Sequence, residues 1–169
     1  MIESLIAALE ANAKAMLAAY EGVSSDAARW RPAPEKWSLL EILRHLADEE
    51  RDDFRRRLGL ILQDPELDWP PIDPEGWARD RSYNSADLPA ALRDFSRERE
   101  ASLTWLRSLG QPDLNREKRH PVAGSLRAGD LLAAWVAHDL LHLRQIANTK
   151  LAHLALTAAP FSIAYASPG

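Results

Sequence analysis

Residues Ser38 to Ile61, SLLEILRHLADEERDDFRRRLGLI, contain the clearest structural signal in the chain. Ser38 and Glu41 form the S-x-x-E pattern of a capping box, in which each side chain hydrogen-bonds the backbone of the other residue at a helix start. Trp37 and Ile42 occupy the two positions of the hydrophobic staple that often accompanies this box. Apolar residues then recur at helical spacing, at Leu39, Leu43, Leu46, Phe54, Leu58 and Ile61. The stretch therefore predicts a long amphipathic helix that begins directly after Ser38.

Three further segments show the same helical period, from about Glu3 to Tyr20, from Leu88 to Leu109 and from Ala128 to Asn148. The last segment is apolar almost all round, which predicts the most buried of the four helices and allows it to continue further. Strand-like alternation of Val, Ile and Thr is missing. We therefore expect an all-α fold, a four-helix bundle that forms a single domain over residues 1–169.

Two connections in this bundle are long, Gly22 to Trp37 and Gln63 to Asp87. Connections of this length are uncommon in compact domains unless they serve as crossovers or functional covers. We expect the second to be a long crossover between helices 2 and 3 of the bundle. The Ala-rich tail, Leu151 to Gly169, is expected to pack against the bundle.

Composition excludes several classes of function. The chain carries 21 Lys and Arg against 25 Asp and Glu, a net charge of −4, which disfavours a protein that binds the nucleic-acid backbone. It has no apolar run of the roughly 18 residues that a membrane-spanning helix needs, and its N-terminus lacks a secretory signal. We therefore expect a cytoplasmic protein with neither nucleic acid nor membrane as a partner. Cysteine is absent, which excludes disulfides, thiolate metal sites and a Cys nucleophile.

His138 and His142 are the most informative polar pair in the sequence. Their i, i+4 spacing places both imidazoles on one face of a helix, one turn apart, where a single metal ion can bind both. They share this face with Leu131, Trp135 and Ile146, so the pair is expected to point into the bundle. A neutral imidazole buried there needs a ligand or a hydrogen bond. The pair is therefore either half of a metal site or two core histidines with hydrogen-bond partners.

Three neighbouring positions extend this hypothesis. His45, on the second helix, projects beyond the edge of the apolar face, which suits either a metal ligand at a solvent-accessible rim or a surface histidine. Glu49 lies one turn further along and is a candidate fourth ligand or base, or a solvated charge. Asp139 falls within the apolar arc of its helix, where it either orients a metal-bound imidazole or pairs with an arginine of another helix.

Charged and aromatic residues at two other places also call for an explanation. Glu50 and Arg99 both project from the middle of an apolar helix face, which predicts a structural ion pair between the second and third helices; the alternative is that Arg99 binds a substrate carboxylate. In the second long connection, Trp69, Trp77 and Tyr83 form either a lid or pocket wall, or aromatic plugs at the end of the bundle.

Three stretches in this order resemble the DinB-like (DinB/YfiT) superfamily of four-helix-bundle proteins: RPAPEKWS at 31–38, EILRHLAD at 41–48 and HDLLHLRQI at 138–146. The resemblance extends over about residues 5–150. In that family, a histidine of the second helix and an H-x-x-x-H pair of the fourth bind a divalent metal. The resemblance therefore implies His45, His138 and His142 as metal ligands, with nickel or zinc as the metal and manganese or iron as further candidates.

Three imidazoles leave a metal with an open position for water, a thiol or a substrate atom. Since the chain has no cysteine, a thiol nucleophile would come from a low-molecular-weight cosubstrate. Characterised members of the family include thiol-dependent S-transferases and a thiol-dependent isomerase. The resemblance thus implies either thiol transfer to an electrophile or hydrolysis of a small-molecule substrate, and the family also contains homodimers. The alternative is a non-catalytic module that binds a metal or a ligand.

Overall fold

The fold is that of a computed structural model, which describes residues 2–122 and 124–166. The capping box at Ser38 is confirmed. The Ser38 hydroxyl accepts a hydrogen bond from the Glu41 amide at 3.1 Å, and the Glu41 carboxylate accepts one from the Ser38 amide at 2.9 Å. Helix α3 (Leu39–Asp48) begins there and is buried over most of its length.

The helix after α3 is not regular, contrary to the sequence prediction of one continuous α-helix. It continues as a π-helix, η1 (Glu49–Phe54), and then as α4 (Arg55–Leu62). The Arg55 amide donates to the carbonyl of Glu50, the i to i+5 bond of a π-helix. This wider turn buries four of its six residues, three of which are acidic: Glu49, Glu50, Asp53 and Phe54.

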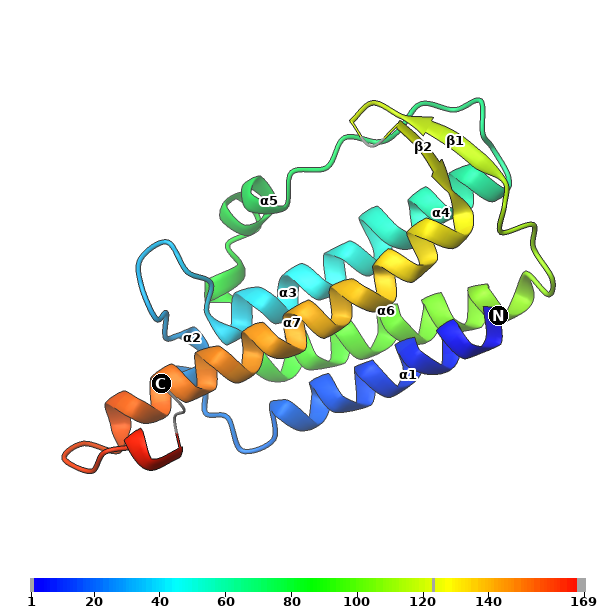
Figure 1. The fold of residues 1–169 in the computed structure, drawn as a ribbon. Helices are drawn as coiled ribbons and strands as arrows, with labels where there is room; N and C mark the ends of the chain where they lie inside the picture. The colour runs from blue at the N-terminus through cyan, green and yellow to red at the C-terminus, as the bar shows by residue number, and fades with distance from the viewer. Residues whose placement is uncertain (1, 123, 167–169) are drawn as a thin grey trace.

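In the described residues, four long helical segments lie side by side along one axis (Figure 1). They are α1 (Ile2–Ala19), the continuous α3–η1–α4 segment, α6 (Leu88–Ser108) and α7 (Ala128–Thr157). The α3–η1–α4 segment and α6 run in the same direction, opposite to α1 and α7, so the chain must return along the bundle between α4 and α6. The predicted four-helix bundle with a long crossover between its second and third helices is confirmed.

The two long connections contain short helices. α2 (Ser25–Arg29) lies between α1 and α3, while the crossover contains α5 (Pro74–Asp80) and the 3₁₀ turn η2 (Tyr83–Ser85). The three aromatic residues of the crossover are held by specific contacts. The buried Tyr83 hydroxyl donates to the Asp48 carboxylate, Trp77 lies under the Arg81 guanidinium, and the Trp69 indole donates to a backbone carbonyl at 2.7 Å.

A β-hairpin between α6 and α7 was not expected from the sequence. β1 (Glu117–His120) and β2 (Gly124–Arg127) pair antiparallel, with Glu117 opposite Arg127. The hairpin lies beside α4, at the end of the bundle far from α2 (Figure 1). Its strands are short and contain a single large apolar residue, Leu126, so they lack the alternating apolar pattern that predicts a strand.

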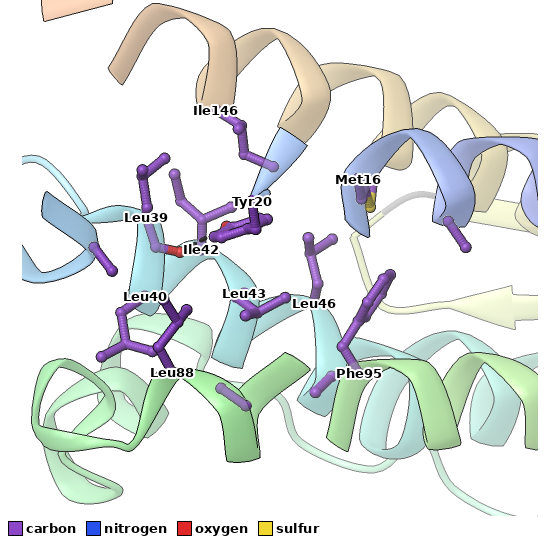
Figure 2. Close-up of a cluster of buried hydrophobic side chains, with 14 residues drawn as sticks. Met16, Tyr20, Leu39, Leu40, Ile42, Leu43, Leu46, Leu88, Phe95 and Ile146 are labelled. Carbon is purple, nitrogen blue, oxygen red and sulfur yellow. Dashed lines mark hydrogen bonds between the residues drawn. The ribbon is translucent and has the colours of Figure 1, made fainter. Parts of the chain in front are cut away.

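The core consists of two clusters of apolar side chains. Figure 2 shows the first, where the leucines and isoleucine of α3 meet Met16 of α1, Tyr20 directly after α1, Phe95 of α6 and Ile146 of α7. The second cluster surrounds Trp135 at the other end of the bundle. α3 therefore lies at the centre of the first cluster, and buried apolar side chains position its polar residues.

The prediction for the fourth helix and the tail needs two corrections. α7 is not the most buried helix, because several of its leucines face solvent; α3 is more completely covered. α7 continues to Thr157, so its C-terminal end extends beyond the C-terminal end of α1 (Figure 1). Packing of the tail is only partial, since Phe161 and Tyr165 are exposed there. Among the described helices, not one has the length and apolarity of a membrane span.

Candidate metal centre

His45, His138 and His142 converge on one point between α3 and α7. The Nε2 atom of His45 lies 3.3 Å from that of His138 and 3.1 Å from that of His142, and the last two are 3.1 Å apart. The three Nε2 atoms therefore form a nearly equilateral triangle. The α-helical spacing of i, i+4 places two of the rings on one side, and the last turn of α3 supplies the third.

All three imidazoles are uncharged at neutral pH. Burial, and then the neighbouring His142 and His138, lower the pKa of His45 to about 2. Burial, and then the neighbouring His142 and Arg99, lower the pKa of His138 to about 3. Burial also lowers the pKa of His142. Each ring can therefore present a nitrogen lone pair, which a metal ligand requires.

The predicted rim position of His45 is wrong, because only 5% of its surface is exposed. Helix periodicity places it beyond the apolar face of α3, but Trp37 covers it from the preceding loop. The Trp37 and His45 rings lie 4.8 Å apart between centroids. Helical projection considers one helix alone and cannot include this cover.

Two more contacts hold the histidine rings. The Nδ1 atom of His142 lies 2.8 Å from Oε1 of Gln145, so a proton on Nδ1 donates to this amide oxygen and leaves Nε2 as the free lone pair. The Phe54 ring lies 5.1 Å from the His138 ring between centroids. Of these residues, Gln145 has a sequence signal, because it is three positions after His142 on the same helix face. The contacts of Phe54 and Trp37 depend on tertiary packing.

The separations of the three nitrogens are those expected for ligands of one metal ion. Zinc binds imidazole nitrogen at about 2.0–2.1 Å, so two nitrogens in a tetrahedral site are about 3.3 Å apart. The observed separations of 3.1 to 3.3 Å match this value. Within residues 2–122 and 124–166, this triad is the cluster of His, Asp and Glu side chains that could hold a metal ion. We call these three residues the histidine triad.

Glu49 lies behind His45, on the edge of the ring opposite the triad. Its Oε1 is 3.8 Å from Nδ1 of His45, and the carboxyl group is buried rather than solvated. Burial, and then the nearby Asp53, raise the pKa of Glu49 to about 9. Since His45 directs its other nitrogen, Nε2, to the triad, Glu49 faces His45 and not the point where the Nε2 atoms meet.

Arg99 joins Glu50 and Asp139 in a buried network next to the triad. Its guanidinium donates to Glu50 at 2.6 Å, to both oxygens of Asp139 at 2.7 Å and to the carbonyl of Leu9 at 2.7 Å. The Trp135 indole also donates to Glu50, at 2.8 Å. The sequence predicts two alternative roles for Asp139, orienting a metal-bound imidazole or pairing with an arginine. The structure shows the pair with an arginine, because both Asp139 oxygens accept hydrogen bonds from Arg99. We call this the arginine network.

A cavity of about 540 Å³ lies beside His142. Its walls come from α7 and from the loop that precedes α3, including Trp37 and Gln145. Trp69, Trp77 and Tyr83 do not line this cavity in the described part of the chain. The sequence hypothesis of a pocket wall built from the crossover is therefore not supported at this cavity, and the loop before α3 takes that place.

The other two histidines lie elsewhere. His120 is in β1, where its Nε2 is 3.1 Å from the Arg57 guanidinium and its ring contacts Trp69. His153 is on α7, three turns beyond the histidine pair, and its ring meets Trp30 edge-on at 5.1 Å. Neither contributes to the triad.

The histidine triad lies within the part of the chain that matches a known protein family. A family model described as the DinB superfamily matches residues 8–146, which include the whole triad. A protein of Oceanobacillus iheyensis named "Putative metal-dependent hydrolase OB0782" is 28% identical over 114 residues. The match spans 66% of this chain and 64% of that protein, so it leaves about a third of the relative's length unmatched.

A solved structure has the same fold. YfiT from Bacillus subtilis, described as "a probable metal-dependent hydrolase with an unusual four-helix bundle topology", superposes with a TM-score of 0.76 at 20% sequence identity. The match covers 88% of this chain and 85% of YfiT.

Proposed function

Since this chain belongs to the DinB superfamily, we propose that it is a metal-dependent hydrolase of a small-molecule substrate. His45, His138 and His142 hold one divalent cation in this proposal. The observation that carries it is the meeting of three uncharged Nε2 atoms within 3.3 Å of one another. The names of the two relatives, both described as metal-dependent hydrolases, support the reaction class.

Imidazole donors suit several first-row metals, zinc and nickel among them. A divalent cation on three imidazoles lowers the pKa of a bound water and polarises a substrate oxygen at its open position. Zinc and nickel are the proposed metals, with manganese and iron as the next to test. The complete domain, residues 1–169, is proposed as the unit that forms the site.

The surrounding side chains hold the ligands in position. Gln145 selects the His142 tautomer by accepting the Nδ1 proton, and Glu49 faces the Nδ1 of His45. Trp37 and Phe54 cover two of the rings and keep water from their apolar faces. Such outer contacts orient ligands and raise metal affinity.

Thiol transfer remains the alternative reaction. It needs an external thiol, since the chain has no cysteine. The site has room for either reaction, because the cavity beside His142 could admit a low-molecular-weight thiol or the substrate of a hydrolase. The names of the relatives favour hydrolysis, so thiol transfer is treated as an outcome of the experiment.

The experiment compares turnover in the zinc-, nickel- and manganese-loaded proteins, with a panel of p-nitrophenyl carboxylate and phosphate esters, with and without a small thiol. We expect release of nitrophenol that requires the metal and is lost in His138→Ala. His153→Ala, a histidine of the same helix outside the triad, is the matched control. Release that requires the thiol and forms a thioester would identify transfer.

A second measurement separates an enzyme from a binding module. In the cobalt-loaded protein, azide should change the visible absorption spectrum, because a three-ligand site keeps a position for an external ligand. No spectral change at saturating azide, together with no turnover, would mean a closed structural site and contradict the proposed function.

A further inference from the structure

The cavity beside His142 has a distinctive charge. Its ionised lining residues are Lys36, from the loop before α3, and Arg144, from α7; no carboxylate lines it. The chain as a whole carries a net charge of −4, so these two cations are not part of a generally basic surface. A pocket with one sign of charge selects ligands of the other sign.

Both cations are available to a ligand. Within residues 2–122 and 124–166, neither the Lys36 ammonium nor the Arg144 guanidinium forms an ion pair or a side-chain hydrogen bond. Other arginines are neutralised inside the fold, as Arg99 is by Glu50 and Asp139. Both side chains are exposed, so an anion can reach them without a change in the fold.

The remaining walls supply amide groups and apolar surface. Gln145 and Asn148 offer side-chain amides, and Pro32, Trp37 and Leu141 form apolar walls. Trp37 is held against His45, so this part of the wall is also part of the cover of the triad. The volume of about 540 Å³ is in the range of small-molecule sites.

From these observations we propose that the substrate is an anionic small molecule with an apolar body, whose carboxylate or phosphate group is bound by Arg144 and Lys36. The apolar body lies against Trp37, and the bond to be cleaved is directed to the triad beside His142. This inference rests on the proposed function for the reaction, but the binding of the anion does not depend on it.

Arg144 should contribute more than Lys36. Lys36 also borders a second hollow that contains Glu35 and Glu75, where its ammonium can turn to carboxylates. Arg144 lines the cavity beside His142 and does not border this second hollow. Its guanidinium can also bind a carboxylate or phosphate through two parallel hydrogen bonds.

The experiment measures binding of benzoate and phenyl phosphate to the zinc-loaded full chain by NMR titration, with benzamide as the neutral match for benzoate. We expect the anions to shift resonances of Trp37, His142 and Gln145, and to bind more tightly than benzamide. Arg144→Gln should weaken benzoate binding by roughly tenfold, the loss typical of one charge-assisted hydrogen bond. Lys36→Gln should weaken it less, and Arg144→Lys should restore part of the loss.

Arg93→Gln is the matched control, since Arg93 is an exposed arginine on α6 outside this cavity. Repeating the titration after removal of zinc separates the cations from the metal, because a carboxylate can also bind zinc directly. Binding that persists without zinc supports the proposal. Equal affinity for benzoate and benzamide, no effect of Arg144→Gln, or complete loss of binding on removal of zinc would each overturn it.

These outcomes remain distinct from failure of the proposed function. A zinc-loaded protein that hydrolyses neutral and anionic esters equally well retains the function and loses this inference. A protein that binds benzoate through Arg144 but has no metal-dependent turnover retains the anion site and loses the function.

Discussion

The histidine triad and the arginine network are two polar clusters in the same bundle interior. Both take residues from α7 and from the α3–η1–α4 segment, and the arginine network adds Arg99 of α6. Asp139 follows His138 directly on α7, and Glu50 lies five residues after His45. In the arginine network, Arg99 meets two carboxylates and a carbonyl at 2.6 to 2.7 Å. In the triad, three uncharged nitrogens face one another at 3.1 to 3.3 Å, and the described side chains place no positively charged group between them.

The difference shows which cluster needs a ligand from outside. Buried charges are expected to be paired, and the arginine network pairs Arg99 with the carboxylates of Glu50 and Asp139. The triad has three acceptors and lacks the positive charge that would satisfy them together. The arginine network is therefore the structural member of the pair, and the triad is the member for which we propose a bound cation.

The largest expected effect comes from breaking the arginine network. Arg99→Met leaves Glu50 and Asp139 buried without their cation, which should lower the free energy of unfolding by about 3–5 kcal/mol. Urea unfolding followed by circular dichroism measures this loss. Arg107→Met is the control, because Arg107 is on the same helix as Arg99 but forms a surface ion pair, with Glu10 of α1. This substitution should lower the free energy of unfolding by less than about 1 kcal/mol. Equal losses in the two variants would contradict a structural role for the network.

The network also predicts a failed rescue. Exchanging the charges of Arg99 and Glu50 places a carboxylate at position 99 opposite Asp139, which accepts from Arg99 with both oxygens. The double variant Arg99→Glu, Glu50→Arg should therefore remain destabilised relative to the wild type. Full recovery of stability would mean that Asp139 is not a member of the network.

Metal addition should stabilise the protein through the triad. A ligand at a hundred times its Kd raises the free energy of unfolding by about 2.7 kcal/mol, which is a rise of roughly 5–10 °C in Tm for a chain of this size. Thermal unfolding with zinc or nickel should show this rise in the wild type and in His153→Ala. His138→Ala should show none. A rise of the same size in His138→Ala would place the metal elsewhere.

A smaller effect is expected from the contact behind one ligand. Gln145→Leu removes the acceptor of the His142 Nδ1 proton and leaves the three ligand atoms in place. Metal affinity should fall by about tenfold, within the range for outer contacts of metal ligands. Competition with a chromophoric chelator measures the affinity. Asn148→Leu, a similar change one turn further along α7, should leave it unaltered, and a loss there as large as that in Gln145→Leu would argue against a specific role of Gln145.

The smallest expected effect is on the number of protons that the protein releases when the metal binds. Three ordinary histidines, with a pKa of about 6.5, would be mostly protonated at pH 5.5 and release nearly three protons on metal binding. Burial keeps the pKa of His45 at about 2 and that of His138 at about 3, so these two should release almost none. Calorimetry in buffers of different ionisation enthalpy measures the number. We expect about one proton or fewer, and a value near three would mean that the rings are solvated before the metal binds.

The parts of the fold that follow from short-range patterns were predictable. The capping box at Ser38, the helical periods and the length of the crossover suffice for a four-helix bundle, because each reflects local backbone chemistry or loop length. The pairing of His138 with His142 follows from helix geometry alone. The inclusion of His45 came from the family resemblance.

The rest depends on contacts between distant segments. The π-helix η1 has no pattern in the sequence, and it brings Glu49 and Asp53 into the interior. Asp139 has two reasonable partners in the sequence, and its pairing with Arg99 of α6 across the bundle interior depends on the tertiary fold. The burial of His45 depends on Trp37, whose loop has no regular structure that a period could reveal. The charge of the cavity arises where that loop meets α7, so neither segment alone predicts it.

The most direct test of the account is the metal content of the protein, purified without chelator or polyhistidine tag and measured by elemental analysis alongside His138→Ala. We predict about one divalent ion per wild-type chain and none in His138→Ala, with His153→Ala equal to the wild type. A wild-type chain that contains no metal, and takes up none from zinc, nickel or manganese, would contradict the assignment of the triad as a cation site.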